Sequence, residues 1–477
     1  MSKAVLLWLG TFLVVAIVLS PRAGAAQDSV LDEILEIMRQ KGQITEEQQK
    51  SLIERAKKER SGIEAGVESS RPFLRSRDDA FRLNIGGRLM TDYHATEDGA
   101  RLLTGAELAD RFLVRRARLE LDGNIFRWIG FALSGEFTEG VSLKDAYLDF
   151  RLLPGLEVRS GQFKVPFSRE ELISSRFIDF VERSLVNELA PSRDAGIVLQ
   201  GSVLDRAVSY AIGVFNGTGE DTADNNSEKE VAGRLVLAPF RPGGNYFLKG
   251  LEIAGNFTWG DNDGSTSSQG RTNARTGNRF RFFAPHSTRG ERTRWGGDLA
   301  WAIGPASVSF EYARQIDERK KVGPGGADLD EVTATAWHVY ATFLLTGEDK
   351  VLGGPIMPKR PFSPIAGRFG PGAWELAVRY AQLDFKSDSP LDFFDGNLGN
   401  GITGGGTTAE NGAQALTAGA TWYVNRQTRV MFNWTRYWYD EDRGTPFSCQ
   451  QTVCGAGNLQ RRGDSSWEVL GRFQIWF

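Results

Sequence analysis

Arginine is the residue type that points most directly to chemistry in this chain. The 477 residues include 43 Arg but only 14 Lys, with 3 His and 2 Cys. So few His and Cys argue against zinc domains, haem attachment and disulfide scaffolds, and leave little for His-based catalysis. A guanidinium binds an oxyanion through a planar fork, whereas an ammonium acts as a point charge. The formal net charge of −3 also argues against a general nucleic-acid binder.

Many of these arginines share every second position of alternating segments with acidic residues. The arginines are Arg82, Arg88, Arg116, Arg118, Arg159, Arg234, Arg379, Arg429 and Arg472. The acids on the same parity are Asp92, Glu120, Asp122, Glu136, Asp145, Asp149, Glu157, Glu311 and Glu375. One interpretation is a salt-bridged wall without selectivity. The other is an arginine cluster facing acids across a narrow channel, because rings of Arg and Lys form anion pores.

The elements that must position these residues begin after an export segment. Lys3 precedes an apolar run over 4–19, and the small residues Ala23-Gly24-Ala25 follow Pro21. This order predicts a cleaved signal peptide over residues 1–25. A membrane anchor is the alternative, but the apolar run is shorter than the ~20 residues that span a bilayer.

Residues 26–62 have helical spacing. Thr45 and Gln48 form a capping box before a second short helix. The narrow apolar stripes favour either a helical hairpin resting on the main domain or a short oligomerising coil in the periplasm. Residues 63–80 are interpreted as a polar linker.

Residues 81–477 change to a two-residue period, which is typical of strands. Alternating segments occur at 81–95, 111–124, 127–138, 142–152, 155–166, 194–204, 206–216, 229–238, 247–260, 292–304, 306–316, 332–346, 373–386, 412–425, 427–440 and 464–477. Very short connections alternate with long polar ones, apart from a long Pro/Gly-rich connection at 347–372. An even number of such segments predicts an all-β fold, a 16-stranded antiparallel transmembrane β-barrel. We expect Phe477 to close the barrel near Phe81.

The connection from Phe167 to Arg193 differs from the other long loops. It contains many apolar residues, including Ile173, Phe180 and Leu185. A loop exposed to water should not carry this much apolar surface. We therefore expect it to fold into the barrel and narrow the pore, bringing Ser174, Ser175 and Arg176 to the lumen.

The few remaining reactive groups predict little chemistry. Cys449 and Cys454 lie in one long loop of an exported chain, which favours a local disulfide. The three His residues are scattered, so we expect no metal site, no cofactor and no catalytic residues.

An ordered set of motifs resembles the phosphate-selective porin O and P family. The set includes Phe112-Leu-Val-Arg115-Arg116-Ala-Arg118-Leu, Asp145-Ala-Tyr147-Leu, Gly161-Gln-Phe163-Lys164-Val-Pro166-Phe167, Glu170-Glu171-Leu-Ile-Ser174-Ser175-Arg176 and Gly372-Ala-Trp374-Glu375-Leu. The resemblance implies trimeric sixteen-stranded barrels for anion diffusion, phosphate in the type members. It also implies a pore that is narrowed by the third loop and lined by arginines.

By resemblance, Arg88, Arg115 and Arg116 match the arginines of the family's pore constriction. Asp145, Ser174 and Ser175 match the other polar groups of that constriction. Strict alternation places only Arg116 of the arginine pair in the lumen, so Arg115 requires a bulge or a strand end. The type members have lysine where this chain has Glu171. Because an acid there raises the cost of binding phosphate, we expect moderate rather than strict phosphate preference.

The sequence therefore predicts an outer-membrane porin for passive diffusion of small anions, and no enzyme. Pore residues are predicted to be Arg88, Arg115, Arg116, Arg118, Asp145, Ser174, Ser175 and Arg176. The alternatives are a non-selective porin, a barrel esterase or phospholipase, and a closed structural barrel. Expected partners are outer-membrane lipid and lipopolysaccharide, two further copies in a homotrimer, and the barrel-assembly machinery through Phe477, with no nucleic acid.

Overall fold

The computed structural model describes residues 34–60, 62–96, 110–138, 140–224, 226–266, 270–271, 281–283, 287–388, 409–439 and 465–477. The predicted signal peptide lies outside these residues. Residues 34–40 and α3 (Glu46–Arg60) are helical. The capping box is confirmed, because Gln48 N donates to Thr45 Oγ1 over 3.2 Å and Thr45 N donates to Gln48 Oε1 over 2.8 Å. The role of this helical segment remains a prediction.

The rest of the described chain is mainly β-strand. The strands are β1 (Ile63–Glu68), β2 (Arg71–Ser76), β3 (Phe81–Thr96), β4 (Arg111–Ile125), β5 (Ile129–Glu136), β6 (Ser142–Leu153), β7 (Leu156–Lys164), β8 (Arg193–Val203), β9 (Val208–Phe215), β10 (Glu230–Leu237), β11 (Leu251–Thr266), β12 (Gly270–Arg271), β13 (Arg281–Phe283), β14 (Ser287–Ile303), β15 (Ala306–Arg319), β16 (Leu329–Leu344), β17 (Phe362–Ser363), β18 (Arg368–Phe369), β19 (Ala373–Ser387), β20 (Ala409–Tyr423), β21 (Thr428–Tyr439) and β22 (Ser465–Trp476). The short helices are α4 (Arg169–Leu172), η1 (Leu185–Glu188), η2 (Pro324–Gly326) and η3 (Pro364–Ala366).

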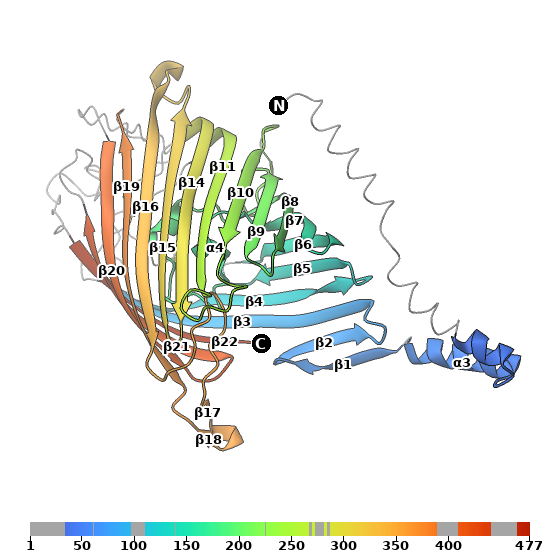
Figure 1. The fold of residues 1–477 in the computed structure, drawn as a ribbon. Helices are drawn as coiled ribbons and strands as arrows, with labels where there is room; N and C mark the ends of the chain where they lie inside the picture. Colours follow the sequence, from blue (N-terminus) through green and yellow to red (C-terminus); the bar gives the residue numbers. More distant parts are fainter. Residues whose placement is uncertain are drawn as a thin grey trace.

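Sixteen strands within the described residues close into an antiparallel barrel, which confirms the predicted fold (Figure 1). Each strand from β3 onward pairs with the next barrel strand along the chain, and β22 closes the ring by pairing with β3. The position of closure was predicted wrongly. Phe477 exchanges two backbone hydrogen bonds of 3.1 Å with Gly87 rather than lying near Phe81. Tilted strands make the first and last strands of a barrel meet with a stagger, which alternation alone does not define.

Side chains alternate across the wall in the sense expected of a membrane barrel. Large apolar side chains on one parity are exposed on the outside, such as Leu133, Trp374 and Phe432. Charged side chains on the other parity are buried inside, such as Arg118 and Glu136. Apolar-out and polar-in alternation is typical of barrels in lipid. No helix in the described part of the chain is long and apolar enough to cross a membrane.

Residues 63–80, interpreted as a linker, instead contain a β-hairpin. β1 pairs with β2, and β2 pairs with the first residues of β3 through Phe73↔Asn84, Leu74↔Leu83 and Arg75↔Arg82. The hairpin lies at the rim of short turns, close to the C-terminus (Figure 1). It pairs with the part of β3 that β22 does not reach, because β22 pairs only from Arg88 onward.

Candidate functional site

The segment between β7 and β8, residues 165–192, lies inside the barrel, and we call it the constriction loop (Figure 1). Its apolar side chains Phe167, Leu185, Val186 and Leu189 are at most 1% exposed. They pack against small and apolar inward residues of the wall, namely Ala313, Val332, Ala334, Ala336, Ala381, Leu383, Phe385, Ala413, Ala415 and Tyr437. Each fully buried side chain contributes about 1.5–3 kcal/mol. The predicted inward folding of this loop is confirmed.

Three inward arginines anchor the constriction loop. Arg379 Nη1 donates to Glu170 Oε1 over 3.2 Å and to the Glu182 carbonyl over 3.1 Å. Arg429 Nη1 donates to the Ile178 carbonyl over 3.0 Å. Arg472 donates to the Val181 carbonyl and pairs with Glu182 over 2.9 Å. These arginines share the lumen parity, but each of them donates to the backbone or side chains of the constriction loop.

The connection between β16 and β19 supports the same loop from the rim of short turns. Lys350 is 2% exposed at its side chain, and its Nζ contacts Asp179 of the loop and Glu375 of β19. Burial opposes the charge of Lys350, but these two carboxylates hold its pKa well above the ordinary value. The anomalous 347–372 connection therefore reaches into the barrel mouth.

The space that the constriction loop leaves open is a cavity of about 910 Å³ along β3 to β10. All eight predicted pore residues line it: Arg88, Arg115, Arg116, Arg118, Asp145, Ser174, Ser175 and Arg176. Twelve cationic and six acidic side chains line it altogether. Three of these cations, Arg115, Arg118 and Arg234, pair with acids that do not line the cavity, so an excess of about three positive charges remains.

Arg88 joins the constriction loop to the wall. Its Nη1 donates to Ser174 Oγ over 3.2 Å and to Ser175 Oγ over 2.8 Å, and its Nη2 pairs with Glu120 of β4. The second oxygen of Glu120 binds Arg176 Nη2 over 2.9 Å. One carboxylate is therefore shared between a wall arginine and a loop arginine.

A β-bulge brings both members of the arginine pair to the cavity. Met90 is paired with Arg116 and the next residue, Thr91, with Val114, so Arg115 is the extra residue. The bulge that Arg115 required is thus confirmed, and bulges often re-aim side chains at functional sites. Arg115 Nε pairs with Glu182 over 2.6 Å. Arg116 is half-buried and has no carboxylate partner in the described part of the chain.

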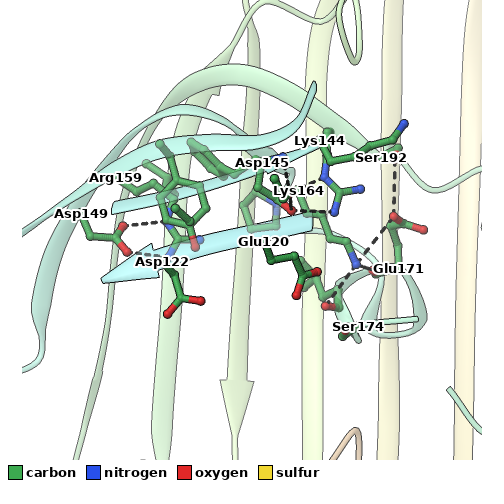
Figure 2. A pocket seen from close by; sticks show the side chains of 18 of the residues that line it. Glu120, Asp122, Lys144, Asp145, Asp149, Arg159, Lys164, Glu171, Ser174 and Ser192 are labelled. Atoms are coloured by element: carbon green, nitrogen blue, oxygen red, sulfur yellow. Dashed lines mark hydrogen bonds and ion pairs between the residues drawn. The ribbon is translucent and has the colours of Figure 1, made fainter. Parts of the chain in front are cut away.

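Other cavity arginines are held by acids. Arg118 binds Glu136 through two nitrogens at 3.2 and 3.1 Å. Arg159 binds Asp149 in the same manner at 2.7 and 2.9 Å (Figure 2). Such pairs orient a guanidinium but reduce the charge that it offers to a passing ion.

Sequence reasoning missed several cavity residues. A second irregularity places Lys144 and Asp145 opposite the single residue Ser134, and Lys144 pairs with Glu220. Arg193 binds Asp145 through two nitrogens at 2.9 and 3.0 Å. Lys144 lies on the parity that alternation assigns to the outside. Only the loss of alternation near 140–146 could have indicated the irregularity.

Glu171 lies in the cavity wall, but its carboxylate faces cations. Arg183 Nε is 3.3 Å and Lys164 Nζ is 3.9 Å from its oxygens, and the residue is 3% exposed. Lys164, which Figure 2 shows beside Glu171, also donates to the Ile173 carbonyl over 3.1 Å. The acid that replaces the family's lysine is therefore paired by two cations.

Ser184 and His338 test the barrel-enzyme alternative. Ser184 Oγ is 2.7 Å from both His338 Nδ1 and Glu170 Oε2. In a hydrolase triad the acid binds the other nitrogen of the histidine, not the serine. Both residues are at most 3% exposed, and neither lines the cavity. This trio therefore serves to attach the constriction loop to β16.

Two further expectations concern disulfides and metals. Cys449 and Cys454 lie outside the described residues. Among the residues that the structure describes, no group of three His, Cys, Asp or Glu side chains could hold a metal ion.

A closed sixteen-stranded barrel with an inward loop and a charged cavity defines the porin class of outer-membrane channels. The chain belongs to the phosphate-selective porin O and P family, whose model matches residues 83–445. This confirms the resemblance seen in the sequence and supports an outer-membrane porin of bacteria.

Individual relatives agree with this class. Porin O of Pseudomonas aeruginosa is 25% identical over 385 residues, covering 74% of this chain and 82% of that protein. OmpT of Vibrio cholerae matches in structure with a TM-score of 0.50 and 11% identity, covering 84% of this chain and 98% of that one. A loop L8 deletion mutant of OmpT matches with the same TM-score, 10% identity, and coverage of 84% and 100%. At such identities the structural likeness concerns the fold alone.

Proposed function

We propose that this porin conducts small anions, phosphate or related oxyanions, by passive diffusion through the arginine-lined constriction. The observation that carries the proposal is the placement of Arg116. It lines the cavity between Arg115 and Arg118 and, among the described residues, has no carboxylate within ion-pair distance. A guanidinium with free donors can bind an oxyanion by two parallel charge-assisted hydrogen bonds.

Passage also requires release. Conduction is fast where an ion meets several weak sites rather than one strong site. The paired arginines Arg118, Arg159 and Arg193 suit this requirement, because their acids weaken each contact. Ser175 Oγ, already close to Arg88, adds a neutral donor at the same level.

The test is a reversal potential across a planar bilayer with a KCl gradient. We expect the wild-type channel to prefer chloride over potassium, and Arg116→Ala to shift the potential toward cations. Arg206→Ala, in the exposed turn between β8 and β9, is the matched control and should leave it unchanged. A wild-type preference for potassium would contradict the proposal.

A non-selective porin is the second candidate. It is favoured by the ion pairs of Arg118, Arg159 and Arg193, which neutralise much of the wall. A wild-type reversal potential near zero, unchanged in Arg116→Ala, would favour this candidate.

We also propose the surroundings in which the channel works. The mature chain begins after about residue 25, and the rim of short turns faces the periplasm. Three copies form a homotrimer in outer-membrane lipid and lipopolysaccharide, assembled through recognition of Phe477. N-terminal sequencing of the purified protein and its mass in mild detergent test the first and third statements.

A further inference from the structure

The β1–β2 hairpin places a cation beside a carboxylate of the cavity wall. Arg71, the first residue of β2, pairs through Nη2 with Asp122 of β4. Asp122 lines the same cavity as Glu120 and Arg176, and Figure 2 shows it beside Glu120. Arg71 thus enters the barrel interior although its backbone belongs to a segment before the first barrel strand.

Gly86 makes room for this side chain. It lies on the inward parity of β3 between Asn84 and Arg88. A Cβ at Gly86 would lie 2.9 Å from both Nε and Nη2 of Arg71, closer than real contacts permit. Gly86 leaves a vacant position on the inner wall, and the guanidinium of Arg71 occupies it.

The arrangement repeats the one at the constriction, two residues further along each strand. At the constriction, Glu120 is shared between Arg88 and Arg176. At the next level, Asp122 is shared between Arg71 and Asn84, whose Nδ2 lies 2.9 Å from Oδ2. The side chain of Arg71 is 29% exposed, although its Nε is buried and has no hydrogen-bond partner among the described residues.

We propose that Arg71 is an additional anion-binding residue of the pore, one step below the constriction toward the rim of short turns. It lies in the N-terminal hairpin, outside residues 83–445, the range that the family model matches. The inference rests on the proposed anion function and extends it. The ligand class is a small oxyanion such as inorganic phosphate.

Phosphate block of chloride current through the full-length trimer tests this proposal. Arg71→Gln should raise the half-blocking concentration of inorganic phosphate about threefold, as expected for one partly exposed charge contact. Gly86→Val, which displaces the guanidinium without changing any charge, should act in the same direction. Arg127→Gln removes an exposed cation from the neighbouring β4–β5 turn and should leave the block unchanged.

A double variant separates binding from simple neutralisation of Asp122. If Arg71 binds anions, phosphate should still block the chloride current of the Arg71→Gln, Asp122→Asn double variant more weakly than that of the wild type. A return to wild-type block would show that Arg71 only neutralises Asp122 and would overturn the inference. Heat-modifiable mobility of each variant reports whether it is folded, and Arg71→Lys, which keeps the charge, should retain most of the block.

The two levels of the proposal fail differently. A wild-type channel that prefers potassium contradicts the proposed anion function itself. An anion-preferring wild type with unchanged block in both Arg71→Gln and Gly86→Val contradicts only the role of Arg71.

Discussion

The two halves of the inner wall are built by different rules. Along β3 to β10 the inward side chains that line the cavity are mostly charged. Along β15 to β21 many of them are small or apolar, and the constriction loop covers them. The polar-inward rule for membrane barrels applies where the wall faces water. Where a loop faces the wall, apolar complementarity replaces it.

Arginine has a different role in each half. Arg379 and Arg472 are 2% exposed and bind the loop, whereas Arg116 faces the cavity with free capacity. Residue type and parity are the same in both halves. The surroundings of each guanidinium decide whether it binds the loop or lines the open cavity.

The largest expected effect, on conductance, comes from removing the constriction loop that covers one half of the inner wall. Deletion of residues 173–185 should increase single-channel conductance severalfold, because the loop fills the part of the lumen next to β15 to β21. Deletion of 321–327, in the β15–β16 connection, is the control and should leave conductance unchanged. An unchanged conductance after the first deletion would show that the loop does not limit the pore.

The second largest effect, on stability, concerns Lys350, which supports the constriction loop in the covered half of the wall. Lys350→Met leaves Asp179 and Glu375 buried without their shared cation. Breaking a buried ion pair in this way costs about 3–5 kcal/mol. We expect a lower midpoint of urea unfolding in detergent, followed by tryptophan fluorescence, and a noisier open-channel current.

Lys359→Met is the control for that variant. Lys359 Nζ donates to the Gly347 carbonyl at an exposed position in the same connection. Equal unfolding midpoints for the two variants would argue against a supporting role for Lys350.

Packing provides a smaller contrast between the halves. Ala381→Leu inserts bulk under the constriction loop, where overpacking costs about 1–3 kcal/mol. Ala132→Leu makes the same change on the cavity side, where there is space. The first variant should unfold at lower urea, while the second should keep its stability and slightly lower the conductance. Equal destabilisation of both would mean that the two walls are packed alike.

The sequence predicted the barrel well because alternation is a local property of each strand. It also indicated a bulge or a strand end at Arg115, since two adjacent arginines cannot share one parity, and the structure has the bulge. It missed Lys144, because the bulge in β6 opposite Ser134 depends on pairing between β5 and β6. It missed the β1–β2 hairpin, whose short strands are stabilised by pairing with β3 rather than by their own pattern. It could not separate Arg379 from Arg116, since that difference arises only when the loop folds inward.

The smallest expected effect concerns Glu171. The sequence suggested that this acid opposes anion binding, but its carboxylate lies beside Arg183 and Lys164. Because two cations already screen it, Glu171→Gln should increase anion preference by much less than Arg116→Ala decreases it. Glu171→Lys should mainly destabilise the constriction loop, since the new lysine would lie beside the two cations Arg183 and Lys164. Reversal potentials of the three variants decide the point, and a shift in Glu171→Gln as large as that in Arg116→Ala would place the acid's charge in the ion path.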